Sequence, residues 1–175
     1  DTAEVASKLL ADEADVGMVG STIRRPGLRL ERLMGDEVVL VVPPDHPFAG
    51  REQVSVEELQ GQALVLREEG SGTRRTVEAA LTSAGITLPS DGVVLVLGST
   101  QAILQTVAQG LGLGFVSARA AAQVQADEHV ACVGLKGVDL RRDLYLAYFP
   151  QRMGDPLVAR FLEFARGQFG SRDSG

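Results

Sequence analysis

Apolar residues along the chain alternate between the three-to-four-residue spacing of helices and the continuous or every-second-residue runs of strands. Helical spacing in AEVASKLLAD predicts a first helix, with Thr2 as its N-cap. The short run DVGMVG (15–20) predicts a buried strand. Every second residue is apolar in LRLERLM (28–34), which predicts a strand with one face in water. The β-branched run DEVVLVVP (36–43) predicts a separate central strand.

The same changes of period continue to the C-terminus. They predict a buried strand at 92–97, further strands at 62–66, 113–117, 129–135 and 143–150, one or two helical turns at 55–61, and helices at 71–84, 99–110, 118–126 and 155–169. In the last helix, the spacing predicts inward positions for Leu157, Phe161, Leu162, Phe164 and Ala165. Strands that alternate with helices predict an α/β fold with helices on both faces of the sheet.

Composition narrows the class of protein. Hydrophobic residues make up 45% of the 175 residues, which is enough for the core of one large domain or two small lobes. The net charge of −6 argues against nucleic acid binding by this segment itself, because phosphate contacts need a basic surface. No apolar run reaches the ~18 residues of a membrane span. The chain begins with Asp rather than Met, so we expect it to be a segment of a longer protein.

The residues that most often carry catalysis or bind metals are few. Cys132 is the one cysteine, which excludes an internal disulfide and a multi-cysteine metal site, and it lies in the middle of a predicted strand. The two histidines, His46 and His129, are far apart and have no ligand spacing. No serine lies in a GxSxG motif. We therefore expect no metal, no cofactor and no catalytic residues, and predict a protein that is not an enzyme.

The stretch LREEGSGTRR (66–75) joins a predicted strand to a predicted helix. Gly70, Ser71, Gly72 and Thr73 have the composition of an anion-binding helix start, where free backbone N–H groups and hydroxyls point outward. The Walker pattern needs a lysine that this stretch lacks, so a nucleotide-hydrolysing loop is excluded. Two interpretations stay open: a ligand-binding loop, or an ordinary N-cap made by Ser71 or Thr73 with the neighbouring acids in solvent.

Three further helix starts carry hydroxyl groups. Gly98, Ser99 and Thr100 follow one predicted strand, Ser117 follows another, and Thr2 begins the first helix. Each of these hydroxyls is equally well explained as a helix cap. In open parallel sheets, however, ligands bind beyond the carboxyl ends of the strands, where helix starts converge. Such a cleft suits a small carboxylate, a sulfate or a polar organic molecule.

Four blocks of the sequence, in one order, resemble the effector-binding domain of LysR-type transcriptional regulators: DTAEVASKLLADEADVGMVG, LERLMGDEVVLVVPPDHPFAG, VSVEELQGQALVLREEGSGTRRTVEAAL and LGSTQAILQTVAQGLGLGFVSARAA. The resemblance implies a two-lobed fold like that of type 2 periplasmic binding proteins, with a mostly parallel sheet in each lobe. Lobe I would comprise 1–42 and 149–175, without its usual first strand and helix, and lobe II would comprise 43–148. Because the missing strand normally lies in the middle of the lobe I sheet, we expect lobe I to be unstable unless a partner chain or another segment fills its place.

The resemblance also implies a function and a site. The domain would sense a small anionic effector between its lobes, and the cytoplasmic bacterial regulator, a homodimer or homotetramer, would contact DNA through an N-terminal winged helix-turn-helix outside this sequence. The effector site carried over is Thr2, Glu69, Gly70, Ser71, Gly72, Thr73, Gly98, Ser99 and Thr100, with Ser117 added from the pattern above. Arg74 is expected to pair either with an effector anion or with neighbouring acids. The alternatives are a solute-binding receptor of a transport system and an enzyme on the same fold.

Overall fold

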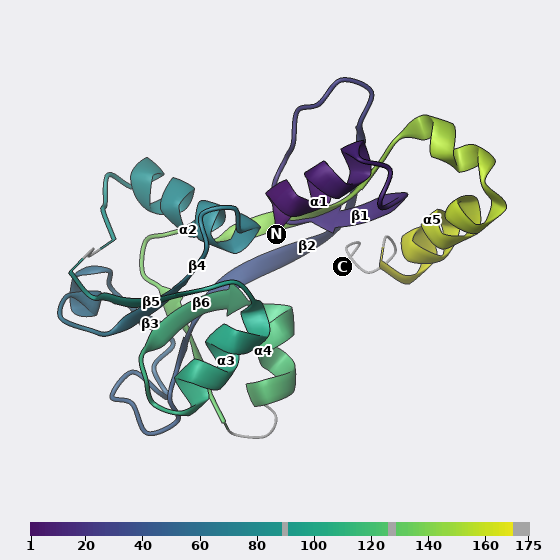
Figure 1. The fold of residues 1–175 in the computed structure, drawn as a ribbon. Coiled ribbons are helices and arrows are strands. Elements are labelled where there is room, and N and C mark those ends of the chain that lie inside the picture. Colours follow the sequence, from purple (N-terminus) through teal and green to yellow (C-terminus); the bar gives the residue numbers. More distant parts are fainter. Residues whose placement is uncertain (89–90, 126–128, 170–175) are drawn as a thin grey trace. The chain divides into compact units, whose positions relative to one another are not determined.

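The computed structural model describes residues 1–88, 91–125 and 129–169, and the chain divides into two units. Unit 1 is Asp1–Asp36 with Arg142–Gly175, and unit 2 is Glu37–Arg141. The chain passes between the units within strand β2 (Arg29–Val42) and at the first residue of strand β8 (Arg141–Tyr148) (Figure 1). The lobe limits expected from the family resemblance lie a few residues away and stay a prediction, since a continuous strand marks no sharp boundary.

Unit 1 is a small sheet with a helix on each face. Its elements are α1 (Thr2–Leu10), β1 (Val16–Val19), the first part of β2, β8, the 3₁₀ helix η2 (Pro150–Gly154) and α5 (Pro156–Phe169), and the strand order is β1-β8-β2. Strand β1 runs antiparallel to β8, so this pairing departs from the mostly parallel sheet expected for lobe I. Alternate residues of β8 face opposite ways: Ala147 packs with Leu9 of α1, whereas Leu146 and Tyr148 pack with α5.

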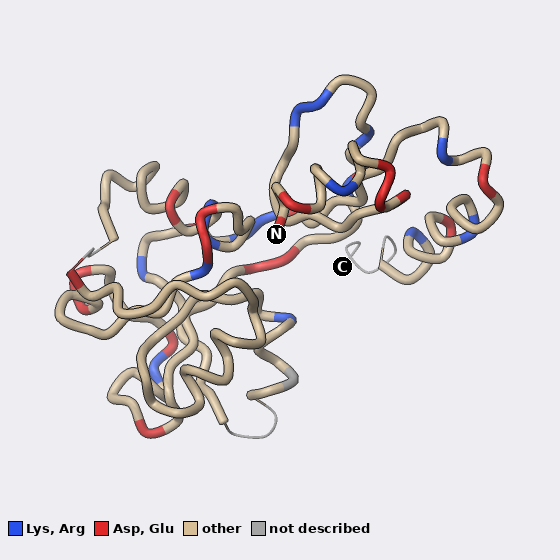
Figure 2. The backbone as a smooth tube through the Cα atoms, in the orientation of Figure 1, with Lys and Arg blue, Asp and Glu red and all other residues tan. Residues whose placement is uncertain are grey.

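Ion pairs connect these elements, and Figure 2 shows the Lys and Arg residues of the chain in blue and the Asp and Glu residues in red. The Tyr148 hydroxyl and the Arg166 guanidinium both donate to Glu31 on β2, at 2.9 Å and 2.6 Å, which links α5 to the sheet. These bonds, that of Arg166 above all, hold the pKa of Glu31 below its usual range. Arg142 donates from Nε to Asp36 Oδ2 at 2.9 Å, and the Asp36 side chain is fully buried.

Unit 2 contains a larger sheet. It comprises β3 (Gln53–Val54), β4 (Leu64–Arg67), β5 (Val93–Leu97), β6 (Leu113–Ser117), β7 (Ala131–Leu135) and the second part of β2. The strand order is β3-β7-β2-β6-β4-β5. Strand β2 is antiparallel to both of its neighbours, whereas β4 is parallel to β5 and to β6. This sheet fits the expectation of a mostly parallel lobe.

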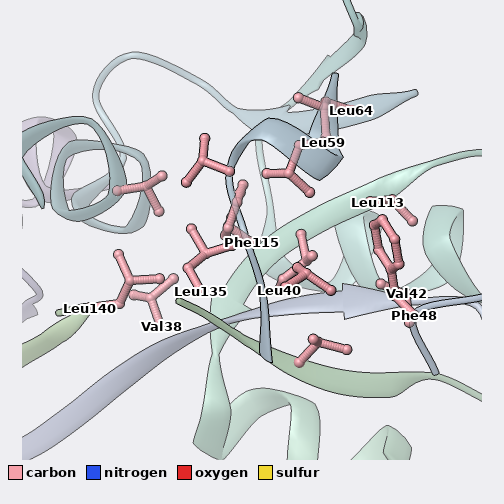
Figure 3. Packing of buried hydrophobic residues seen from close by; sticks show 14 of the residues in the cluster. Val38, Leu40, Val42, Phe48, Leu59, Leu64, Leu113, Phe115, Leu135 and Leu140 are labelled. Carbon is pink, nitrogen blue, oxygen red and sulfur yellow. The ribbon is translucent and has the colours of Figure 1, made fainter. Parts of the chain in front are cut away.

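Helices cover both faces of the unit 2 sheet, as predicted from the sequence. One face packs against α2 (Gly72–Ser83) and the 3₁₀ helix η1 (Glu57–Leu59), and the other packs against α3 (Thr100–Ala108) and α4 (Ala118–Gln125). The predicted last residue of α4, position 126, lies outside the described residues. Figure 3 shows the first of these cores, which is aliphatic apart from two phenylalanines and includes Val38, Leu40, Val42, Phe48, Leu59, Leu64, Leu113, Phe115, Leu135 and Leu140.

Two local predictions near the N-terminus were wrong. The strands expected at 28–34 and 36–43 are one 14-residue strand, β2. The separation followed from the change between an alternating and a continuous apolar pattern, but Asp36 lies inside the strand, where Arg142 neutralises its buried carboxylate. Thr2 is the first residue of α1 rather than its N-cap. Asp1 caps the helix instead, accepting from the Glu4 N–H at 2.7 Å.

Two predictions about burial were also wrong. The strand β5 is not buried: it is the last strand of the order above, and Val94, Leu95 and Val96 are all exposed. In α5, Leu162 and Ala165 point inward as predicted, but Leu157, Phe161 and Phe164 are 79%, 49% and 61% exposed. The described helices include none long and apolar enough to cross a membrane.

Candidate functional site

Three parallel strands of unit 2 end at the same edge of the sheet, and a helix starts after each of them. β4 leads into α2, β5 into α3 and β6 into α4. Arg67, the last residue of β4, is paired in register with Leu97, the last residue of β5. The helix starts therefore gather at the carboxyl edge of β5, β4 and β6. Their unpaired backbone N–H groups and helix dipoles favour a negative charge there.

The loop between β4 and α2 is tied to the neighbouring strand. The Glu68 N–H donates to the Leu97 carbonyl at 3.3 Å, and the Ser71 N–H donates to the Glu68 carbonyl at 3.0 Å. Ser71 occupies the N-cap position of α2 and is buried, yet its side chain makes no capping hydrogen bond. Thr73 lies inside the helix and is also buried. Ser71 is therefore the N-cap residue of α2 by position, without a capping hydrogen bond, and Thr73 is not the cap. Ligand binding by this loop stays a prediction.

The loop between β5 and α3 differs. The Ser99 hydroxyl accepts from the Ala102 N–H at 3.1 Å, so Ser99 caps α3 as expected. The Thr100 hydroxyl accepts a hydrogen bond from Arg67 Nη1 at 2.9 Å. Arg67 Nη2 also lies 3.4 Å from the Gly98 carbonyl oxygen. One arginine therefore connects the end of β4 to the start of α3.

Arg67 is the site residue that reasoning from the sequence missed. Its side chain is only 11% exposed, and it forms a two-point ion pair with Glu68, from Nε to Oε2 at 2.8 Å and from Nη2 to Oε1 at 2.7 Å. Arg67 holds the pKa of the Glu68 carboxyl below its usual range. The available signal was an arginine at the end of an apolar strand, directly before the glycine-rich loop.

Arg74, the cation that the sequence did single out, has protein partners. Its Nε donates to Glu78 at 2.7 Å and its Nη1 donates to the Arg67 carbonyl at 3.2 Å. Of the two roles expected for Arg74, pairing with a neighbouring acid is the one seen. A small hollow lies beside it, and is lined by Leu66, Arg67, Thr73, Arg74, Val77, Glu78, Leu88 and Phe115.

The remaining predicted site residues have different positions. Glu69 is exposed and Gly70 half-buried in the loop after Glu68, and Ser117 ends β6 and has a partner within the protein. Unit 2 therefore contains, at its three strand ends, the predicted residues Glu69, Gly70, Ser71, Gly72, Thr73, Gly98, Ser99, Thr100 and Ser117. Thr2 belongs to unit 1, where it is buried at the start of α1, so its contribution to the same site is part of the proposal below.

Two side chains considered for catalysis, Cys132 and His46, are partly buried or hydrogen-bonded within unit 2. Cys132 is half-buried on β7, and burial raises the pKa of its thiol, which disfavours the reactive thiolate. Both ring nitrogens of His46 have partners: Nδ1 accepts from the Phe48 N–H at 3.2 Å, and Nε2 lies 3.3 Å from Gln62 Oε1. Across residues 1–88, 91–125 and 129–169, no three His, Cys, Asp or Glu side chains are grouped as metal ligands.

Comparison with known proteins shows the family of this chain. Residues 1–170 match the family model for the LysR substrate binding domain. The RuBisCO operon transcriptional regulator of Allochromatium vinosum is 30% identical over 154 residues, which cover 88% of this chain and 50% of that protein. The chain thus spans about half the length of the curated relatives that it matches.

Solved structures show the same fold. The regulatory domain of CcmR from Synechocystis PCC6803, in complex with 2-PG, matches with a TM-score of 0.84 at 22% identity, over 98% of this chain and 81% of that chain. The effector binding domain of QuiR, in complex with shikimate, matches with a TM-score of 0.81 at 17% identity, over 98% of this chain and 79% of that chain. At these identities the likeness concerns the fold alone.

Proposed function

We propose that this chain, which belongs to the LysR substrate-binding-domain family, is the effector-sensing part of a LysR-type transcriptional regulator. The single observation that carries the effector site is the common edge of β5, β4 and β6. There, two glycine- and hydroxyl-rich loops begin helices α2 and α3 beside a buried arginine. Such an edge offers backbone N–H donors and a positive field without fixed catalytic groups.

We propose a small anionic metabolite as the effector, with a carboxylate as its most suitable group. The backbone donors at the starts of α2 and α3, and the guanidinium of Arg67, all favour negative charge. Two proteins of the same fold were solved with small molecules bound, 2-PG in CcmR and shikimate in QuiR. Thr2, at the start of α1 in unit 1, is proposed to complete the site from the other lobe.

The proposed mechanism is a change in the relative arrangement of the two lobes. An effector shifts such an equilibrium only by its difference in affinity for the two arrangements. In the whole regulator, this change would alter how subunits of a homodimer or homotetramer place their DNA-binding segments. The charge of −6 on this chain fits a protein in which a separate segment contacts DNA in the cytoplasm.

Two other functions would use the same fold differently. A solute-binding receptor would bind the same class of ligand without any effect on DNA binding. An enzyme would need a reactive group at the strand ends, where the described side chains are hydroxyls, carboxylates and paired arginines. Measuring the DNA affinity of the full-length protein with and without ligand separates a regulator from a receptor.

The site is tested by ligand-dependent thermal stability of the chain, with shikimate and a panel of small organic acids. Ser71→Ala and Ser99→Ala should each weaken the binding of any stabilising acid by about tenfold, because each removes a hydroxyl at a helix start. Without ligand, Ser99→Ala should cost about 1 kcal/mol as a lost cap. Ser71→Ala should cost less, because Ser71 makes no capping bond.

Ser83→Ala is the matched control for both variants. The Ser83 hydroxyl donates to the Ala79 carbonyl at 2.8 Å, at the opposite end of α2 from the site. It should change stability slightly and leave ligand affinity unchanged. Wild-type affinity in both the Ser71 and the Ser99 variants would remove the assignment of the site to these strand ends.

A further inference from the structure

The ion pair between Arg67 and Glu68 has an unusual position. Consecutive residues form a two-point pair at the place where the starts of α2 and α3 favour an anion. The carboxylate of Glu68 therefore occupies the guanidinium that an anionic ligand would be expected to bind. All of these groups belong to unit 2, and no residue of unit 1 is involved.

The two members of this pair are held differently. Arg67 is the less exposed side chain, and it is also anchored by the Thr100 hydroxyl at 2.9 Å. Glu68 is 27% exposed, and Arg67 holds its carboxylate through Nε and Nη2. Glu68, the more exposed side chain, can turn toward solvent once another anion pairs with Arg67, whereas Arg67 cannot leave without losing its bond to Thr100. The arginine is the fixed member of the pair and the glutamate is the exchangeable one.

We propose that Glu68 is a built-in competitor for Arg67, and that a ligand carboxylate or phosphate binds by displacing it. This inference rests on the proposed effector site and adds the residue that recognises the anion. The exchange keeps the nearly buried guanidinium paired in both states, which avoids the high cost of an uncompensated buried charge. Two-point recognition also selects ligands with a forked anionic group, since a guanidinium matches that geometry and an ammonium does not.

The exchange makes a quantitative statement about affinity. A ligand that must displace an internal competitor binds with its intrinsic affinity reduced by the fraction of molecules in which Arg67 is available. Removing the charge of Glu68 therefore raises the affinity for an external anion. Replacing the guanidinium of Arg67 by a group that cannot donate at two points lowers this affinity, whatever residue stands at position 68.

Inorganic phosphate is the probe, titrated into the 175-residue chain and followed by calorimetry. We expect Glu68→Gln to bind phosphate about 3- to 10-fold more tightly than wild type, and Arg67→Lys to bind it at least 10-fold more weakly. Glu52→Gln is the matched control, because it removes the same charge from an exposed residue of unit 2 that lies directly before β3, outside the proposed site. Its affinity should stay within about twofold of wild type, as expected for a screened surface charge.

Three results would overturn the inference. The first is equal tightening by Glu68→Gln and Glu52→Gln, which would reduce the effect to general electrostatics. The second is wild-type affinity in Arg67→Lys, and the third is the absence of phosphate binding in both wild type and Glu68→Gln. Phosphate binding that depends on Ser71 and Ser99 but not on Arg67 would contradict this inference and agree with the proposed effector site. Phosphate binding that depends on Arg67, with no effect of ligand on the DNA affinity of the full-length protein, would support this inference and contradict the proposed regulator function.

A second measurement does not depend on any variant folding. In wild-type protein, the NMR signal of the Arg67 Nε–Hε group should move on phosphate addition, because its acceptor changes from Glu68 to the ligand. The corresponding signal of Arg74, which donates to Glu78, should move less. An Arg67 signal that stays constant while phosphate binds would contradict the exchange.

Discussion

At the residue scale, the chain contrasts buried and exposed charges within a single unit. Arg142 and Asp36 are nearly enclosed, with side chains 10% and 0% exposed, whereas the neighbouring pair Arg32–Asp143 is largely in water. Both pairs have Nε–oxygen distances near hydrogen-bond length, at 2.9 Å and 2.8 Å. Burial, rather than distance, therefore decides how much each pair matters for stability.

We expect Arg142→Met to lower the free energy of unfolding by about 3 kcal/mol, because it removes the guanidinium that neutralises the buried carboxylate of Asp36. Arg32→Met is the matched control and should cost less than about 1 kcal/mol. Urea denaturation of the two variants and wild type measures both values. Equal losses in the two variants would contradict the assignment of Asp36 as a charge that must be neutralised inside the strand.

The same scale shows what the sequence could and could not reveal about the site. Gly70 to Thr73 and Gly98 to Thr100 were recognisable, because a hydroxyl- or glycine-rich junction after an apolar run is a local pattern. Arg67 was not, since its importance lies in reaching Thr100 at 2.9 Å, a residue 33 positions away. The sequence also could not tell which serine caps its helix, because Ser71 and Ser99 both fit the pattern of a cap. Only Ser99 makes the capping bond with its hydroxyl.

At the element scale, the predictions succeeded where burial produces the pattern. Strand β6 lies at residues 113–117 as predicted, because both of its faces are buried and its apolar run is continuous. The run in β5 looks the same in sequence, yet the strand ends the sheet order and is exposed. Helix α5 is a second case of apolar residues that the fold leaves exposed, because its apolar face extends beyond its contact with the sheet to Leu157, Phe161 and Phe164. Periodicity shows which residues are apolar, and the neighbours that cover them are set by the tertiary fold.

Unit 1 should be the less stable unit of this chain. In the described residues, its strand β1 pairs on one side only, with β8, and Met18 on that strand is exposed. The exposed face of α5 adds uncovered apolar surface to the same unit. Hydrogen exchange of the monomeric chain should therefore show weaker protection of β1 and β8 than of β4 and β6, because a small sheet with few buried contacts opens more easily. Equal protection of the two units in a monomer would refute this expectation.

At the scale of the whole molecule, the residues of the proposed effector site come from both units. Unit 2 contains the strand ends, the two loops and the arginine that favour an anion, and unit 1 contains Thr2. We propose that a regulator of this family converts binding between such units into a change in DNA contact made elsewhere in its chain. The acidic charge of this segment is consistent with that division.

The central claim is that a small anion binds at the carboxyl edge of β4 and β5, and backbone NMR of the chain titrated with inorganic phosphate tests it most directly. The account predicts the largest shifts in the N–H signals of 68–73 and 98–102, since those groups begin α2 and α3. The N–H signals of β3 and β7, on the far side of β2 in the same sheet, should remain constant. Saturable shifts confined to other parts of the chain, with 68–73 and 98–102 unaffected, would contradict it.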